Sequence, residues 1–116
     1  LANLKKESGI VSGASRHVNR IDTIQRIYEY NHVVVDPHTA DGIYVGKRFI
    51  EDDVPMICLE TALPTKFEST VREALGFAPE RRDSLKNIED KERRVYEMSG
   101  SLTELKNYII KNAKIN

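Results

Sequence analysis

The stretch VVVDPH limits the possible fold of this chain more than any other part of its sequence. Its three valines, residues 33–35, are consecutive β-branched residues, which favour a short strand covered on both faces. Asp36 is suited to capping a helix, and Pro37 suits the first helical position because its missing N–H would have no partner there. We therefore expect a strand to end and a helix to begin within two residues.

The same change from strand to helix recurs in the central part of the chain. A helix is predicted to begin at Asp22, with Gln25 in the position of a capping-box partner, and to end near Asn31. MICL, residues 56–59, is predicted to form a second buried strand, and the helix that follows it should end at Gly76. This order indicates an α/β fold with a short parallel sheet flanked by helices.

The chain divides into three parts on its sequence pattern. Residues 1–20 contain glycines and serines and are expected to form a loop-like leading segment. Residues 21–78 form the α/β portion with its two strand ends, and residues 79–116 form a charged connector and a C-terminal helix. VYEM in the connector is a candidate strand. The last helix has an S-x-x-E capping box at Ser101, and it is expected to bury Leu102, Leu105, Tyr108 and Ile109.

The composition argues against nucleic-acid and membrane partners. The 18 basic and 18 acidic residues give a formal net charge of +0, and they are interspersed without a basic stripe. No apolar run approaches the length of a membrane span. The single cysteine, Cys58, lies in an apolar run and is expected to pack in the core. With no signal peptide visible, we expect a cytoplasmic protein.

The two predicted strand ends carry the residues best placed to bind a ligand. In a parallel sheet, ligands bind beyond the carboxyl ends of the strands. Here those ends are residues 36–39, with the sequence Asp-Pro-His-Thr, and residues 60–62, with the sequence Glu-Thr-Ala. A site at this edge of the sheet would therefore bring together side chains from two separate motifs.

The residues alone leave several chemical roles open at these ends. A metal site is not expected, because neither His17 nor His32 stands at a ligand spacing from Asp36 and His38. The G-x-S-x-G turn of a serine nucleophile is absent. His38 is either a general base or a solvent-facing histidine at a helix start. Thr61 either caps a turn or presents its hydroxyl to a ligand.

Two stretches together resemble the C-terminal part of threonine synthase. They are VVVDPHTADGIYVGKRF, residues 33–49, and MICLETALPTKFESTVREALG, residues 56–76. That family shows a D/E-P-H-T/A-A-x-G motif and, further along, a strand that ends in T-A-H-P-A-K-F. The resemblance covers about residues 8 to 114. The family's histidine before proline is Leu63 here, its alanine before lysine is Thr65, and Glu60 replaces a small residue.

The resemblance implies a pyridoxal-phosphate enzyme of the tryptophan-synthase-β type, whose larger fold is doubly wound. Such a lyase would convert O-phosphohomoserine and water into threonine and phosphate, a step of threonine biosynthesis. By motif position, Thr61 would bond the pyridine nitrogen of the cofactor, with Ala62 beside it. Asp36, His38 and Thr39 would line the same edge of the sheet as further cofactor-binding residues, with His38 and Thr39 near the cofactor or the substrate. A hydroxyl, unlike a carboxylate, does not force that nitrogen to be protonated.

Two features of the family have no counterpart in these residues. They are the Schiff-base lysine and the glycine-rich cradle for the cofactor phosphate, which lie upstream in the family. Lys66, in the first turn of a helix, is expected to be a solvated lysine. Because the chain also starts without methionine, we expect a C-terminal piece with no catalytic residue of its own, inactive alone. Pyridoxal phosphate would be held mainly by the N-terminal part, and the partners would be O-phosphohomoserine and the remainder of the same enzyme.

A second hypothesis is a stand-alone, non-catalytic α/β module for binding or interaction. A piece of a larger sheet should expose hydrophobic patches, whereas a stand-alone module should hide its apolar side chains. A catalytically dead relative of the enzyme is not distinguished from the first hypothesis by these residues.

Overall fold

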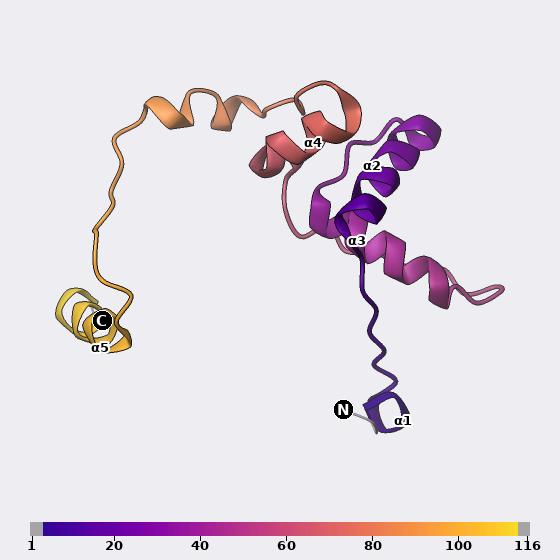
Figure 1. Ribbon diagram of the computed structural model, residues 1–116, viewed down its shortest axis with the longest axis horizontal. Helices are drawn as coiled ribbons and strands as arrows, with labels where there is room; N and C mark the ends of the chain where they lie inside the picture. The colour runs from indigo at the N-terminus through magenta and orange to yellow at the C-terminus, as the bar shows by residue number, and fades with distance from the viewer. Residues whose placement is uncertain (1–3, 114–116) are drawn as a thin grey trace. The chain divides into compact units, whose positions relative to one another are not determined.

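The computed structural model describes residues 4–113, which form helices joined by extended segments (Figure 1). The chain divides into two units, the first ending at Asp83 and the second beginning at Ser84. Within the described residues there is no β-strand, and Glu51 and Val54 form an isolated antiparallel bridge. The predicted parallel sheet is therefore not confirmed.

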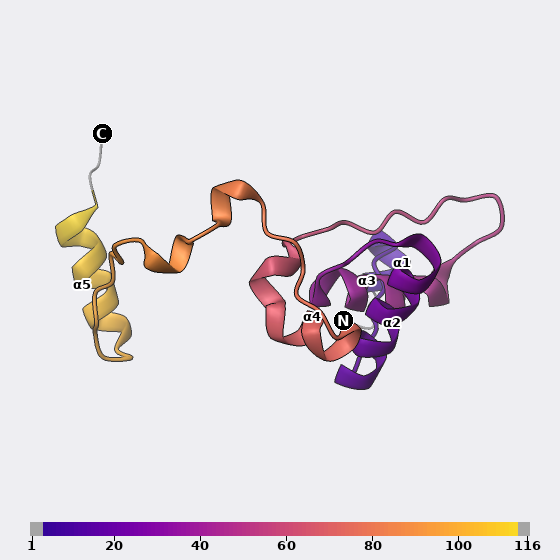
Figure 2. The ribbon, with the colours of Figure 1, turned by 90° about the horizontal axis from the view of Figure 1, so that it is seen from above.

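The first unit is built from helices around α2. Its helices are α1 (Leu4–Ser8), α2 (His17–Asn31), α3 (Pro37–Gly46) and α4 (Glu68–Leu75), with 3-10 turns at Lys47–Phe49 and Pro64–Phe67. A further 3-10 turn, Asp83–Leu85, lies where the two units meet in sequence. Helix α2 packs against both α3 and α4, as Figures 1 and 2 show. This arrangement brings the two segments that follow the predicted strands onto one small helical core.

The core of the first unit lies where α2 meets α3 and α4. Ile24, Ala40 and Val71 have no exposed surface, and Val35 and Ala74 are also buried. Partly buried side chains pack around them, namely Ile21, Ile27, Ile43 and Leu75. Val35, the residue just before the Asp-Pro pair, packs in the same core as Ile24 of α2. This packing holds the start of α3 against α2.

Helix α2 begins earlier than the sequence pattern predicts. It starts at His17, not at Asp22, because the backbone N–H of Arg16 donates to Oδ1 of Asn19 at 3.0 Å and organises the first turn. Asp22 instead lies inside the helix and pairs with Arg26 at 3.0 Å. The predicted end at Asn31 is confirmed, and the next residue takes a left-handed conformation with φ 56°.

Helix α3 confirms the expected cap. Asp36 has an extended backbone and its side chain accepts the N–H of His38, while Pro37 is the first helical residue. The helix ends at Gly46 and continues as the 3-10 turn Lys47–Phe49.

Helix α4 follows the 3-10 turn Pro64–Phe67, and it ends as predicted. Its C-terminal residue is followed by Gly76, whose φ of 78° lies in the left-handed region that favours glycine. The N–H of Gly76 donates to the carbonyl of Arg72 at 2.8 Å.

The two predicted strands are extended but unpaired. Residues 56–59 are all exposed, with Ile57 and Leu59 retaining 78% and 77% of their surface. The prediction that Cys58 packs in the core is therefore wrong. The physical reason is that a strand requires a neighbour to receive its N–H and C=O groups, and no described residue pairs with residues 56–59.

The second unit contains a 3-10 turn, Ile88–Asp90, and helix α5, Leu102–Asn112. The predicted cap of α5 is confirmed, since the N–H of Glu104 donates to Oγ of Ser101 at 3.4 Å. The VYEM stretch is exposed and forms no strand. The prediction that the apolar side of α5 is buried is wrong within this unit. Its side chains Leu102, Leu105 and Ile109 remain 66%, 43% and 52% exposed. Tyr108 is half-buried, and its ring packs against Tyr96 with centroids 5.3 Å apart.

Candidate functional site

A ring contact joins the two sequence motifs. His38 lies in the first turn of α3, and Phe67 ends the 3-10 turn that precedes α4. Their ring centroids are 5.0 Å apart and their planes meet at 82°, an edge-to-face contact. The turn at residues 36–39 and the turn Pro64–Phe67 therefore lie side by side in the first unit.

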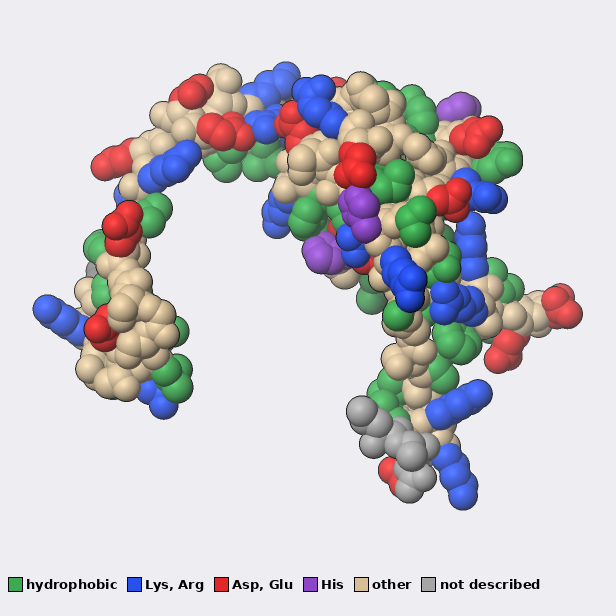
Figure 3. All heavy atoms as spheres, in the orientation of Figure 1, with side chains coloured by type: hydrophobic (Ala, Val, Ile, Leu, Met, Phe, Trp, Pro, Cys, Tyr) green, Lys and Arg blue, Asp and Glu red, His purple; other side chains and the backbone are tan. Residues whose placement is uncertain are grey.

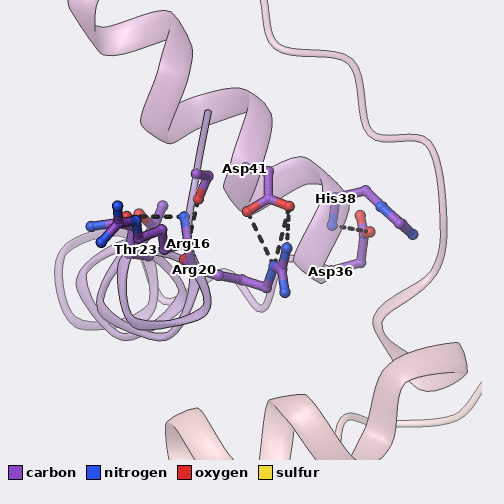
Figure 4. Close-up of polar contacts among 8 residues, drawn as sticks. Arg16, Arg20, Thr23, Asp36, His38 and Asp41 are labelled. Carbon is purple, nitrogen blue, oxygen red and sulfur yellow. Dashed lines mark hydrogen bonds and ion pairs between the residues drawn. The ribbon is translucent and has the colours of Figure 1, made fainter. Parts of the chain in front are cut away.

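The turn at residues 36–39 is held together by one buried carboxylate. Asp36 has no exposed surface. Its Oδ1 accepts the N–H of His38 at 2.9 Å (Figure 4), and its Oδ2 accepts the hydroxyl of Thr39. Thr39 is itself buried. The side chains of Asp36 and Thr39 thus bond to each other, and His38 is the exposed side chain of this turn.

The second motif lines a hollow of about 270 Å³. Its lining residues are Glu60, Thr61, Ala62, Leu63 and Lys66. Thr61 is exposed, Ala62 is half-buried, and Lys66 is exposed as expected. The hollow therefore offers a hydroxyl, a carboxylate and an ammonium group around an open surface, which suits a small ligand with polar atoms.

One polar atom beside the hollow has no partner. Oγ1 of Thr65 is buried, and no described atom bonds to it. An unbonded buried hydroxyl costs free energy. The sequence marks this position too, because Thr65 stands where threonine synthases, which the chain resembles, have an alanine without a hydroxyl.

An ion pair that the sequence did not reveal fixes α3 on α2. Arg20 donates from Nε and Nη2 to the carboxylate of Asp41, at distances of 3.1 and 2.6 Å (Figure 4). Burial alone would raise the pKa of Asp41, but hydrogen bonds from Arg20 and Ser15 hold that pKa below its usual value. Because Asp41 lies one turn after His38, this pair also fixes the direction in which the turn at residues 36–39 faces.

Two further contacts fix α4 on α2. Nε2 of His17 lies 2.8 Å from Oε1 of Glu73, and Nε2 of Gln25 donates to the carbonyl of Ala74 at 2.9 Å. Gln25, which the sequence suggested as a capping residue, therefore links two helices instead. Helix α3, which contains most of the first motif, and helix α4, which follows the second, are both anchored to α2.

The described residues offer no metal-binding group. Within residues 4–113, no three side chains of the histidine, cysteine, aspartate or glutamate types lie close enough to hold one ion. In the same range, no helix has the length and hydrophobicity needed to cross a bilayer.

Comparison with known proteins identifies the family. Residues 39–109, more than half of the chain, match the family described as threonine synthase, C-terminal. The chain belongs to the threonine synthase family. The matched range begins inside the first motif and runs through the second motif and most of α5.

Two curated threonine synthases illustrate how much of the enzyme is matched. The Methylobacillus glycogenes enzyme is 43% identical over 104 residues, which is 90% of this chain and 22% of the relative. The Corynebacterium glutamicum enzyme is 38% identical over 113 residues, which is 94% of this chain and 24% of the relative. The chain thus spans less than a quarter of the length of these threonine synthases.

A solved structure shares the fold of this region. It is an X-ray structure of a threonine synthase from Brucella melitensis with PLP bound. The two align with a TM-score of 0.71 at 24% sequence identity, over 94% of this chain and 27% of the solved chain. The likeness at this level of identity concerns the fold alone.

Proposed function

We propose that this chain forms one wall of the pyridoxal-phosphate site of a threonine synthase, which converts O-phosphohomoserine and water into threonine and phosphate. The observation that carries the proposal is the contact between His38 and Phe67, which sets the two family motifs side by side. The Thr61 hollow lies directly before Phe67 in the chain. Membership of the family, and the PLP bound to the Brucella melitensis relative, support the choice of cofactor.

The hollow fits part of such a cofactor. The Thr61 hydroxyl is exposed and forms no hydrogen bond with any described residue, so it is available to a ring nitrogen. Ala62, whose side chain is small, lines the same hollow. When bound, pyridoxal phosphate supplies an electron sink for carbanions formed from the substrate. A hydroxyl partner leaves the pyridine nitrogen without a full negative charge beside it, which favours a neutral ring.

The residues of the first turn have different tasks in this proposal. His38 is exposed and its ring contacts Phe67, and in this proposal its imidazole donates to the cofactor or to the phosphate of the substrate. Asp36 and Thr39 bond to each other inside the turn, and they position His38. The remainder of the enzyme provides the lysine that carries the cofactor and the cradle for its phosphate, so the chain alone is inactive.

In the complete enzyme, residues 33–35 and 56–59 form neighbouring strands of a parallel sheet in a doubly wound fold. Both segments are extended runs of apolar residues, and both lead directly into a motif. Residues 56–59 are exposed on both faces, as expected for a strand whose covering layers come from elsewhere. Helix α3 lies between the two segments in the chain and would form the crossover.

The role of Thr61 is tested in a chimaera. In it, the matched segment of the Methylobacillus glycogenes threonine synthase is replaced by this chain, and threonine formation from O-phosphohomoserine is measured. Thr61→Val should lower kcat/KM about ten-fold to a hundred-fold, because the ring nitrogen loses its partner.

Thr61→Ser is the matched control, since it keeps the hydroxyl and should retain most of the activity of the unaltered chimaera. If Thr61→Val turned over substrate as fast as Thr61→Ser, the hydroxyl would have no part in binding the ring.

The cytoplasmic setting and the place in threonine biosynthesis belong to the same proposal.

A further inference from the structure

Helix α5 carries an apolar stripe that no described residue of its own unit covers. The stripe consists of Leu102, Leu105 and Ile109, which recur at the three- and four-residue spacing of one helix face. All three side chains are exposed, by 66%, 43% and 52%. Figure 3 shows uncovered hydrophobic side chains on this unit. Thr103 and Asn107 lie on the other side of the helix, so the stripe has a polar boundary.

A hollow of about 420 Å³ adjoins the stripe at the start of the helix. Met98, Leu102 and Leu105 give it an apolar wall, and residues 99–101 complete it. Two hydrogen bonds link the residues beside this wall: Oγ of Ser99 donates to Oε2 of Glu104 at 2.6 Å, and the N–H of Glu104 donates to Oγ of Ser101. An apolar hollow next to a helical stripe suits the insertion of a large apolar side chain from a partner.

The helix itself requires such a partner. Isolated helices shorter than about 12 residues are marginal in water, and most helical stability in proteins comes from packing of the apolar face. Helix α5 has 11 residues, and among the described residues of its own unit the ring of Tyr108, which is not part of the stripe, packs against Tyr96. The stripe is thus the face on which the stability of this helix depends.

We propose that the stripe docks on an apolar surface of the threonine synthase polypeptide N-terminal to the segment that this chain matches. The family match runs through Ile109, so the stripe belongs to the family's C-terminal region and is not an added tail. The curated relatives have more than three-quarters of their length outside the matched segment, which provides ample surface for this contact.

The size of the stripe favours an occupant in the same polypeptide over a second copy of the chain. A stable dimer buries roughly 800 Å² on each partner, which three partly exposed side chains cannot supply. A contact within one polypeptide costs far less translational and rotational entropy, so a small apolar stripe is sufficient there.

The proposal is tested by thiol labelling in the chimaera defined above, with Cys58→Ser as the background. Leu105→Cys reports on the stripe, and Asn107→Cys on the opposite side of the helix is the matched control. In the isolated chain, both thiols should react with a maleimide at similar rates. In the chimaera, the thiol at position 105 should react at least about ten-fold more slowly than the control thiol at position 107, because the contact removes it from solvent.

Similar rates for both positions in the chimaera would overturn the proposal. So would slowing of the position-105 reaction in the isolated chain as its concentration rises, because a second copy would then be the occupant. A chimaera that stays unfolded while the isolated chain folds would overturn it too, since the contact requires the two surfaces to fit. Labelling needs no activity, so an inactive chimaera with a protected position 105 would refute only the proposed function.

Discussion

Asp36 organises the candidate site from inside the molecule. A buried carboxylate must be bonded or paired, and Asp36 meets this requirement by accepting from the backbone of His38 and the hydroxyl of Thr39. These two bonds define the first turn of α3. They also leave His38 as the exposed side chain of the turn. The buried carboxylate of this turn therefore helps to set the position of its exposed histidine.

The Thr65 hydroxyl allows a single-residue test of the packing beside the second motif, because it is buried and has no hydrogen-bond partner. Thr65→Ala removes an unsatisfied polar atom and should leave the free energy of unfolding of the chain unchanged or raise it by up to about 1 kcal/mol. Urea unfolding followed by circular dichroism measures this change. A loss of stability above about 1 kcal/mol would mean that the hydroxyl is bonded in solution.

Local sequence predicted those single residues whose partners are neighbours along the chain. The cap at Asp36, the helix stop at Gly76 and the cap at Ser101 were all predicted, because a few adjacent residues decide each of them, although the Glu104 side chain accepts from Ser99 and does not complete the predicted capping box. The bond between Arg20 and Asp41 was not predicted, since it joins residues 21 positions apart and leaves no local pattern. The fold alone brings such residues together.

The segment before α2 packs so closely against α3 that Gly13 has no room for a side chain. A methyl group built on Gly13 would lie 2.6 Å from Cγ1 of Val45, whereas one built on Gly42 in α3 would meet nothing within 4 Å. Gly13→Ala should therefore lower the free energy of unfolding by about 1–2 kcal/mol, because Val45 must move. Gly42→Ala should raise it by about 0.5–1 kcal/mol, as in other helix interiors.

Denaturant unfolding of the two variants measures both changes. If Gly13→Ala were as stable as Gly42→Ala, the segment before α2 would not pack against Val45 in solution.

The ion pair between α2 and α3 should appear in the pH dependence of stability. The pKa of Asp41 is held below its usual value; burial opposes this, and the hydrogen bonds from Arg20 and Ser15 outweigh it. A carboxyl group whose pKa falls on folding stabilises the protein above its unfolded pKa of about 3.9, and this stability is lost as the pH falls through the folded pKa. Asp41→Asn should lower stability near neutral pH by about 1 kcal/mol and flatten the decline in acid.

Asp22→Asn is the control, since Asp22 forms an exposed pair with Arg26 within one helix. The measurement is denaturant unfolding at neutral pH and near pH 3. An acid dependence identical in the two variants and the unaltered chain would contradict the role of the Arg20–Asp41 pair.

Sequence patterns distinguished helices from extended segments better than they predicted pairing. The apolar runs at residues 33–35 and 56–59 are extended, but neither belongs to a β-strand among the described residues. Pairing is a property of two segments, and a single run of residues contains no information about whether its neighbour is present. The same reason applies to α5, whose Leu102, Leu105 and Ile109 were predicted to be buried but are exposed.

Taken as a whole, the chain exposes many large apolar side chains, as Figure 3 shows for one face. Exposed examples occur in the extended segment at residues 56–59 and along α5. A stand-alone module was expected to hide such side chains. The exposure agrees instead with the comparisons, in which this chain matches less than a quarter of each curated enzyme.

The most direct test of the central claim is a crystal structure of the chimaera with pyridoxal phosphate bound. The account predicts that Oγ1 of Thr61 lies within hydrogen-bond distance of the pyridine nitrogen, about 2.6–3.2 Å, with His38 at the rim of the same site. A ring nitrogen bonded to another residue, with Thr61 more than about 4 Å away, would contradict it.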